Sequence, residues 1–263
     1  ANTIDAQQLK IPAPSPTQTV KQDFGISSME LIYSRPGIKG RKVFGDLVPY
    51  GKVWRTGANQ ATRIKFADDV TIAGQPLKAG EYAIFTVPNE KEWEIIINKG
   101  SENWGTNYNQ SADILRVKVK PEKLNDAVET FTMQFADVKP TTAALQIMWE
   151  KTGVTIPIAT DIDKKVMAQI ENVMFKDNRP YFSAAMYYLD SGKDLSQAVQ
   201  WFDKAIELNP NAFWIYHQKA NALAKLGKIE DARKTAQKSM ELATSQKNDD
   251  YVALNKKLLD TLK

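Results

Sequence analysis

One segment, residues 35–59, is rich in side chain types that bind anions or sugars. Arginine guanidinium groups bind carboxylates and phosphates through pairs of parallel hydrogen bonds. Tyrosine and tryptophan add flat stacking surfaces with a polar edge, and glycine lets the backbone come close to a ligand. We therefore predict a site for a small anionic or sugar-like ligand, or for a partner, formed by Arg35, Arg41, Tyr50, Trp54, Arg55 and Asn59.

A second polar and aromatic segment, residues 99–108, follows later in the chain. Its Lys99 and Trp104 complete the predicted site if this segment faces residues 35–59. If it faces elsewhere, it is an ordinary surface loop. The sequence leaves both arrangements open.

The same residues support a structural interpretation in which segment 35–59 closes one end of a domain. In that case Arg55 pairs with Asp46, Trp54 and Phe44 fill the interior, and Asn59 turns the chain. A connection of about 25 residues in a compact domain is usually functional or packed as an Ω-loop. Both interpretations stand at this point.

The chain carries few groups for catalysis. Its 263 residues include no cysteine and one histidine, and 35 basic against 31 acidic side chains give a formal net charge of +4. Disulfides, thiolate nucleophiles and cysteine zinc sites are therefore excluded. The usual signals of serine hydrolases, dinucleotide-binding proteins and P-loop proteins are absent. We expect no cofactor, no metal, no nucleic-acid partner and no membrane span.

Catalysis by carboxylates is the alternative function for the same segment. A hydrolase or lyase of this kind uses one carboxyl group as acid and a second as base or nucleophile. Asp46 and Glu81 are the pair that the sequence offers. A separation suited to a glycosidase, beside Arg55 in a concave site, would favour this function.

Apolar residues alternate with polar ones from about residue 28 to 158, which predicts strands. The clearest case is 114–120, where Leu115, Val117 and Val119 share one face. Glycine, proline and asparagine separate the strands, and one such turn is predicted at Thr152-Gly153. No helical segments lie between them, so we predict an antiparallel β-sandwich over 20–158, after an extended tail over 1–19. Strands are predicted at 29–34, 62–66, 69–73, 81–87, 92–98, 114–120, 128–135, 143–149 and 154–158.

From about residue 161 the apolar period changes to 3.6, which predicts an all-α domain over 160–263. Leu195 and Ile229, like Ala198 and Ala232, lie 34 positions apart. This spacing, with Phe202 and Pro210, resembles the tetratricopeptide repeat, so we predict a short helical stack with 162–175 and 249–262 as caps. The last helix is expected to bury Tyr251, Leu254, Leu258 and Leu262 and to expose Asn255.

A concave face of such a stack binds extended peptides in tetratricopeptide proteins. In this interpretation Trp214, His217, Asn221 and Lys225 line that face and contact a protein partner. The alternative is that these residues fill space on the flank of a helix, because two repeats form only a shallow groove.

Four motifs carry a resemblance to a known family: Tyr33-Ser-Arg-Pro36, Lys39-Gly-Arg41, Phe44-Gly-Asp-Leu-Val-Pro-Tyr-Gly51 and Trp54-Arg-Thr-Gly-Ala-Asn59. Over about residues 14–158 the chain resembles a bacterial family of envelope-associated proteins classed as a domain of unknown function. The resemblance implies a β-sandwich, export to the periplasm with the signal sequence removed, and in some members tetratricopeptide-like repeats behind the domain. It implies no reaction, so we expect a non-enzymatic binding or scaffolding protein of the bacterial envelope.

Overall fold

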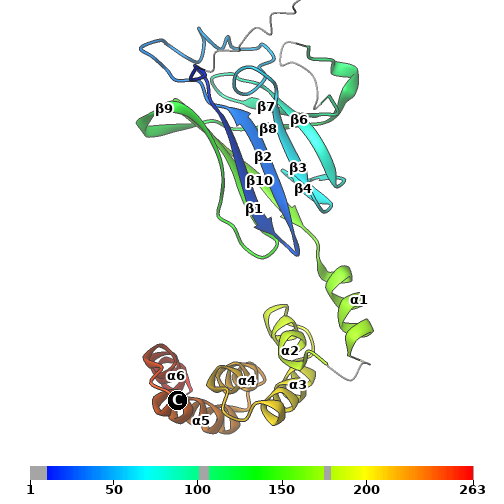
Figure 1. The fold of residues 1–263 in the computed structure, drawn as a ribbon, viewed down its shortest axis with the longest axis vertical. Helices are drawn as coiled ribbons and strands as arrows, with labels where there is room; N and C mark the ends of the chain where they lie inside the picture. Colours follow the sequence, from blue (N-terminus) through cyan, green and yellow to red (C-terminus); the bar gives the residue numbers. More distant parts are fainter. Residues whose placement is uncertain (1–10, 101–106, 175–178, 263) are drawn as a thin grey trace, which may run out of the picture. The chain divides into compact units, whose positions relative to one another are not determined.

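Two units, one of strands and one of helices, account for the chain in the computed structural model (Figure 1). The first ends at Ile162 and the second begins at Asp163. The structure describes residues 11–100, 107–174 and 179–262. The predicted fold class, an antiparallel β-sandwich followed by a tetratricopeptide-like helical stack, is confirmed.

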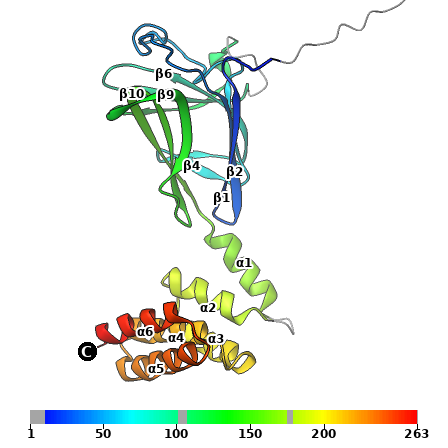
Figure 2. The same ribbon diagram turned by 60° about the vertical axis from the view of Figure 1, so that its left-hand side comes forward.

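The strand unit contains two antiparallel sheets that face each other (Figure 2). The six-stranded sheet has the order β1 (Thr17–Phe24), β2 (Ser27–Ser34), β3 (Thr62–Phe66), β6 (Gly80–Val87), β7 (Trp93–Asn98) and β8 (Asp113–Val119). The four-stranded sheet has the order β5 (Gln75–Leu77), β4 (Val70–Ile72), β10 (Thr142–Thr160) and β9 (Glu122–Ala136). We call this unit the β-domain.

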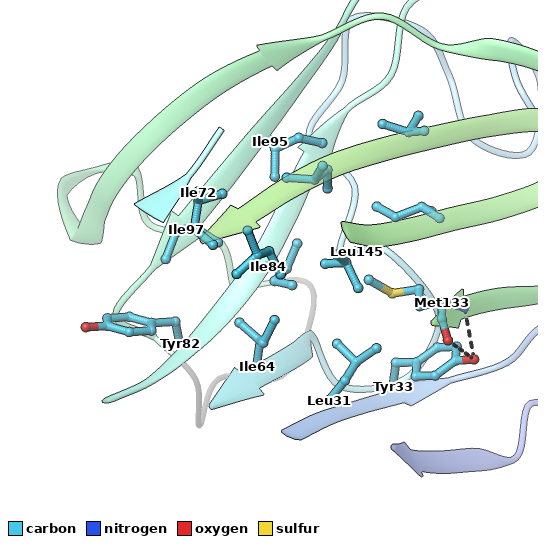
Figure 3. Packing of buried hydrophobic residues seen from close by; sticks show 14 of the residues in the cluster. Leu31, Tyr33, Ile64, Ile72, Tyr82, Ile84, Ile95, Ile97, Met133 and Leu145 are labelled. Atoms are coloured by element: carbon cyan, nitrogen blue, oxygen red, sulfur yellow. Dashed lines mark hydrogen bonds between the residues drawn. The ribbon is translucent and has the colours of Figure 1, made fainter. Parts of the chain in front are cut away.

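The core lies between the two sheets because alternate residues of each strand point to the same face. Figure 3 shows buried side chains from both sheets in contact across this core. Leu31, Ile64 and Ile84 come from the six-stranded sheet, and Met133 and Leu145 come from the four-stranded sheet. Removing this apolar surface from water is the main force that holds the sheets together.

The end of the β-domain differs from the prediction. Residues 142–160 form one strand, β10, whereas the sequence predicted two strands with a turn at Thr152-Gly153. The pairing of β10 with β9 is irregular around Glu150, whose φ is 55°. A Cβ atom on Gly153 would lie 2.8 Å from Leu124 Cδ2. Gly153 therefore lets the side chain of Leu124 come close to the backbone of β10, next to a bulge. A close contact and a bulge are the two common reasons for a glycine inside a strand.

Strands β1 and β5 were not predicted, because both are edge strands with few apolar residues. β1 begins at Thr17, so the last three residues of the predicted tail pair with β2. Residues 1–10 of that tail lie outside the described residues.

The second unit, which we call the helical stack, follows the 3.6-residue period. Its helices in the described residues are α1 (Asp163–Val173), α2 (Tyr181–Asp190), α3 (Leu195–Leu208), α4 (Phe213–Lys225), α5 (Ile229–Ser245) and α6 (Asp249–Thr261). Ala198, Ala220, Ala232 and Ala236 are fully buried, which lets the helix backbones approach closely. No helix in the described part of the chain is long and apolar enough to cross a bilayer.

Candidate functional site

Segment 35–59 crosses one end of the sandwich and is attached to both sheets. On one side, Trp54 forms two backbone hydrogen bonds with Thr86 of β6, of 2.7 and 2.9 Å. On the other side, the Ile38 amide donates to the Glu129 carbonyl of β9, and the Phe131 amide donates to Pro36. These bonds hold the ends of the segment, so its side chains have defined positions.

Arg35 and Tyr33 connect the end of β2 to the edge of β9. Arg35 donates from Nε to the Phe131 carbonyl at 3.1 Å and from Nη2 to the Thr132 hydroxyl at 2.9 Å. The Tyr33 hydroxyl accepts from the Met133 amide at 3.0 Å (Figure 3). Burial raises the pKa of Tyr33. Arg35 therefore uses Nε and Nη2 on acceptors within the protein, and these two donors are not free to bind a ligand.

Replacing Arg35 by alanine is expected to lower the free energy of unfolding of the β-domain by about 2–3 kcal/mol, because two acceptors lose a charged donor. Urea unfolding followed by tryptophan fluorescence measures the loss. The control is Arg63→Ala, which removes an ion pair of 3.2 Å with Glu81 on the sheet surface. Exposed pairs of this kind contribute about 1 kcal/mol or less. If both variants lost the same free energy of unfolding, the proposed role of Arg35 in connecting β2 to β9 would be contradicted.

Trp54 belongs to a cluster of aromatic rings at the end of the core. It stacks on Trp149 at 5.9 Å between ring centroids and meets Phe131 edge-on at 5.2 Å. Phe44 meets Trp93 edge-on at 5.1 Å. Trp54 Nε1 donates to the Gly57 carbonyl at 3.1 Å. Phe44 and Trp54 thus fill this end of the sandwich, and one edge of Trp54 is left at the surface.

A strained turn follows Trp54. Thr56 is fully buried with φ 56°, although a β-branched residue rarely adopts positive φ. Its hydroxyl lies 3.0 Å from that of Thr86, and its carbonyl accepts from the Thr62 hydroxyl. Gly57 has φ 142°, and a Cβ atom there would lie 3.0 Å from the Ser34 carbonyl oxygen. Buried hydrogen bonds therefore hold a costly conformation, and such strain is concentrated at functional sites.

Arg55 lies immediately before this turn and differs from the other arginines of the segment. Its Nε atom is buried and has no hydrogen-bond partner within the described residues. Those residues also give it no ion pair, so the predicted pairing with Asp46 does not occur in this structure. Arg55 lines a cavity of about 290 Å³. Arg41, Leu47, Trp54, Gly57, Ala58 and Trp149 are among its other walls.

The other predicted residues of segment 35–59 occupy different places. Arg41 lines the Arg55 cavity, but its Nε and Nη2 donate to the carbonyls of Ile38 and Gly37 at 3.0 and 2.8 Å. Tyr50 is exposed and lines a separate cavity of about 220 Å³ with Glu90. Partial burial, followed by the charges of Glu90 and Glu150, raises the pKa of Tyr50.

Asn59 and Lys99 are not among the residues that line the Arg55 cavity. The Asn59 amide donates to the Ser15 carbonyl at 3.2 Å and to the Ser34 hydroxyl at 3.3 Å. Lys99 is exposed at the end of β7, and its amide donates to the Ala112 carbonyl. Trp104 lies outside the described residues. The structure therefore groups Arg41, Trp54 and Arg55 at one cavity, and the lining of that cavity does not include Arg35, Tyr50, Asn59 or Lys99.

A polar network that the sequence did not reveal lies beside Lys99. The Asp113 carboxylate accepts from the Tyr108 hydroxyl at 2.6 Å and from Arg116 Nε at 2.9 Å, and Arg116 also pairs with Glu94 at 2.8 Å. Burial and the bond to Asp113 raise the pKa of Tyr108. These groups satisfy one another, so the network stabilises the β7–β8 edge. In the sequence, the signal for this network was the alternation of charged and apolar side chains along β8.

The two carboxylates proposed for catalysis have different surroundings in the structure. Glu81 pairs with Arg63 near the start of β6. It lies five residues, or roughly 17 Å along an extended strand, from Thr86, which contacts Trp54. Asp46 is exposed within segment 35–59. Glycosidases place their carboxyl groups about 5–9.5 Å apart, so this geometry gives the hydrolase alternative no support.

His217 lies inside the helical stack and is 7% exposed. Its Nδ1 is 2.8 Å from Asn255 Oδ1, and the Asn255 amide donates to the Ser239 hydroxyl at 2.8 Å. The Ser239 hydroxyl donates in turn to the Phe213 carbonyl at 2.7 Å. This chain links α4, α5 and α6, so His217 joins helices and does not face solvent. The expectation that Asn255 is exposed was wrong, since its exposed fraction is 0%.

The three remaining residues predicted for peptide binding differ in exposure. Trp214 is half-buried and packs against the cluster of α2, α3 and α4. Asn221 is half-buried and donates to Gln218 at 3.4 Å. Lys225 is exposed at the end of α4. Trp214 and Asn221 are therefore accessible only in part.

Comparison with known proteins supports the division of the chain. Residues 179–212 and 201–234 each match a tetratricopeptide repeat. Protein STIP1 homolog from Dictyostelium discoideum is 44% identical over 52 residues, which cover 20% of this chain. The chain spans only 9% of the length of that relative. Residues 15–158, more than half of the chain, match a family described as a protein of unknown function. The chain therefore belongs to the DUF2911 family, with tetratricopeptide repeats behind the family domain.

Proposed function

We propose that the β-domain binds a small anion in the Arg55 cavity, while the helical stack contacts a protein partner. The tetratricopeptide repeats indicate a protein-interaction scaffold. The anion site is the finer part of the proposal and depends on Arg55. An exported, periplasmic location in a bacterium belongs to the same proposal and rests on the resemblance of the four motifs.

The observation that carries the proposal is the buried Arg55 Nε without a partner in the described residues. A guanidinium is charged at every physiological pH. Burying one of its donors without an acceptor is costly, and such groups in folded proteins are normally hydrogen-bonded. An anion in the adjacent cavity would supply the missing acceptor. The strained turn at Thr56 and Gly57 holds the backbone next to Arg55 in place.

The charge of the surrounding segment supports the same conclusion. Residues 35–59 contain one acidic side chain, Asp46, and a clear excess of basic ones. The basic residues are Arg35, Lys39, Arg41, Lys42, Lys52 and Arg55. A local excess of one sign of charge raises the concentration of counter-ions at a surface and speeds their binding. Within this segment, the excess of basic side chains favours an anion as the ligand.

Thermal shift and calorimetric titration of the full chain with phosphate, sulfate and acetate test the site. At least one anion is expected to raise the melting temperature of the β-domain, because ligand bound to the folded state stabilises it by mass action. Arg55→Met keeps the aliphatic stem and removes the charge, so it should abolish this shift. Arg63→Ala, on the sheet surface, should retain it. Equal shifts in Arg55→Met and the natural chain would refute the proposal.

A further inference from the structure

We infer that the Arg55 cavity accepts a carboxylate attached to a compact apolar group, in preference to an inorganic anion. The inference rests on the proposed function and names the chemical class of its ligand. Two observations carry it: the donors left free in the cavity and the composition of its walls.

The free donors suit one carboxylate. Nε–H and the neighbouring Nη–H of a guanidinium form parallel hydrogen bonds to the two oxygens of a carboxylate. Arg55 lines the cavity, and its Nε is buried and unpaired in the described part of the chain. The second arginine of the cavity, Arg41, already uses its own Nε and Nη2 on backbone carbonyls. One arginine therefore keeps this edge free, which matches a single planar carboxylate better than a phosphate that needs several donors.

The walls suit an apolar group. Apart from the two arginines, the cavity is lined by five larger apolar residues, Pro36, Leu47, Val48, Trp54 and Trp149, and by Ser15, Gly57 and Ala58. Val48 and Trp149 are themselves buried, so the apolar surface open to a ligand comes from the other three large residues. Leu47 is 42% exposed, so part of an apolar side chain on the cavity wall is open to solvent. An inorganic anion would leave this apolar surface in contact with water. An alkyl or aryl group bound against it would remove it from water, which stabilises the bound state.

The size of the cavity limits the ligand. Its volume of about 290 Å³ lies at the lower end of the usual range for small-molecule sites, about 300–1,000 Å³. It corresponds to roughly ten water molecules at about 30 Å³ each. A short acyl chain or one aromatic ring with a carboxylate fits this space.

The test is a calorimetric series on the full chain with acetate, butanoate, hexanoate and phenylacetate, compared with phosphate and with hexanamide. Affinity is expected to rise up to roughly fourfold for each added methylene, from the transfer free energy of a buried CH₂. Hexanamide, which lacks the charge, should not bind measurably. Arg55→Met should abolish binding of every carboxylate, and Arg55→Lys should weaken it because a lysine ammonium lacks the planar pair of donors.

Leu47→Ser gives a second variant that does not depend on the arginine. Leu47 is exposed, so this variant should fold, and it should lower the affinity for hexanoate and phenylacetate more than the affinity for acetate, which reduces the gain per methylene. Arg55-dependent binding of phosphate without any gain along the carboxylate series would overturn the inference and leave the anion site standing. Hexanamide binding as tightly as hexanoate would also overturn it. If no anion binds in an Arg55-dependent way, the proposed function fails as well.

Discussion

Replacing Trp54 by alanine is expected to lower the free energy of unfolding of the β-domain by about 3 kcal/mol, the lower end of the range for buried aromatic residues. Its indole lies against Phe131 and Trp149, and its Nε1 holds the Gly57 carbonyl. The variant leaves a cavity between these rings and releases the strained turn. Guanidinium chloride unfolding followed by near-ultraviolet circular dichroism measures the change.

Tyr50→Ala is the matched control for Trp54→Ala. Both residues are aromatic members of segment 35–59, but Tyr50 is 38% exposed and takes part in none of the ring contacts of the cluster. Its loss should change the free energy of unfolding by about 0.5 kcal/mol or less. A loss as large as that of Trp54→Ala would mean that the segment is held by its surface contacts. A negligible loss in Trp54→Ala would contradict the packing role of the indole.

Replacing Phe202 by alanine is expected to destabilise the helical stack by about 3–5 kcal/mol. The ring is fully buried between α2 and α3 and lies 6.1 Å from Phe182, centroid to centroid. A loss of this size is a large fraction of the stability of a typical domain, about 5–15 kcal/mol. Circular dichroism at 222 nm during heating measures it, because the helices dominate that signal.

Leu208→Ala is the control for Phe202→Ala, because both residues lie on α3. Leu208 is 74% exposed, so its loss should change stability by about 0.5 kcal/mol or less. The unfolding of the β-domain, followed by amide hydrogen exchange in its strands, should be the same in both variants if each unit depends on its own core. A large effect of Leu208→Ala would show that α3 contacts more of the chain through its outer face.

The last helix shows how far a periodic pattern can be trusted. The pattern predicts a helix over 249–262, and α6 spans Asp249–Thr261. The prediction of which residues of α6 face the interior was partly wrong, because Leu254 is 45% exposed while Asn255 is fully buried. Asn255 is buried because His217 and Ser239 supply its hydrogen bonds. A buried amide needs such partners, and they come from α4 and α5.

The sequence by itself determined the local structure and the division of the chain. Side chains alternate in a strand and repeat every 3.6 residues in a helix, so the apolar pattern indicates which element forms. The 34-residue spacing and the motifs of residues 33–59 indicated the helical repeats and the family in the same way. These features depend on neighbours in the chain and are therefore visible without the fold.

Only the tertiary structure decided which arginine is available to a ligand. Arg35, Arg41 and Arg55 share one segment and one side-chain chemistry. Arg35 is occupied by Phe131, 96 positions away, and Arg41 is occupied by the turn that precedes it. Arg55 lines a cavity that Trp149 of β10 completes, and its buried Nε finds no acceptor in the described residues. Whether a donor is satisfied depends on which acceptors the folded chain places around it, and that information lies in contacts between residues far apart in the sequence.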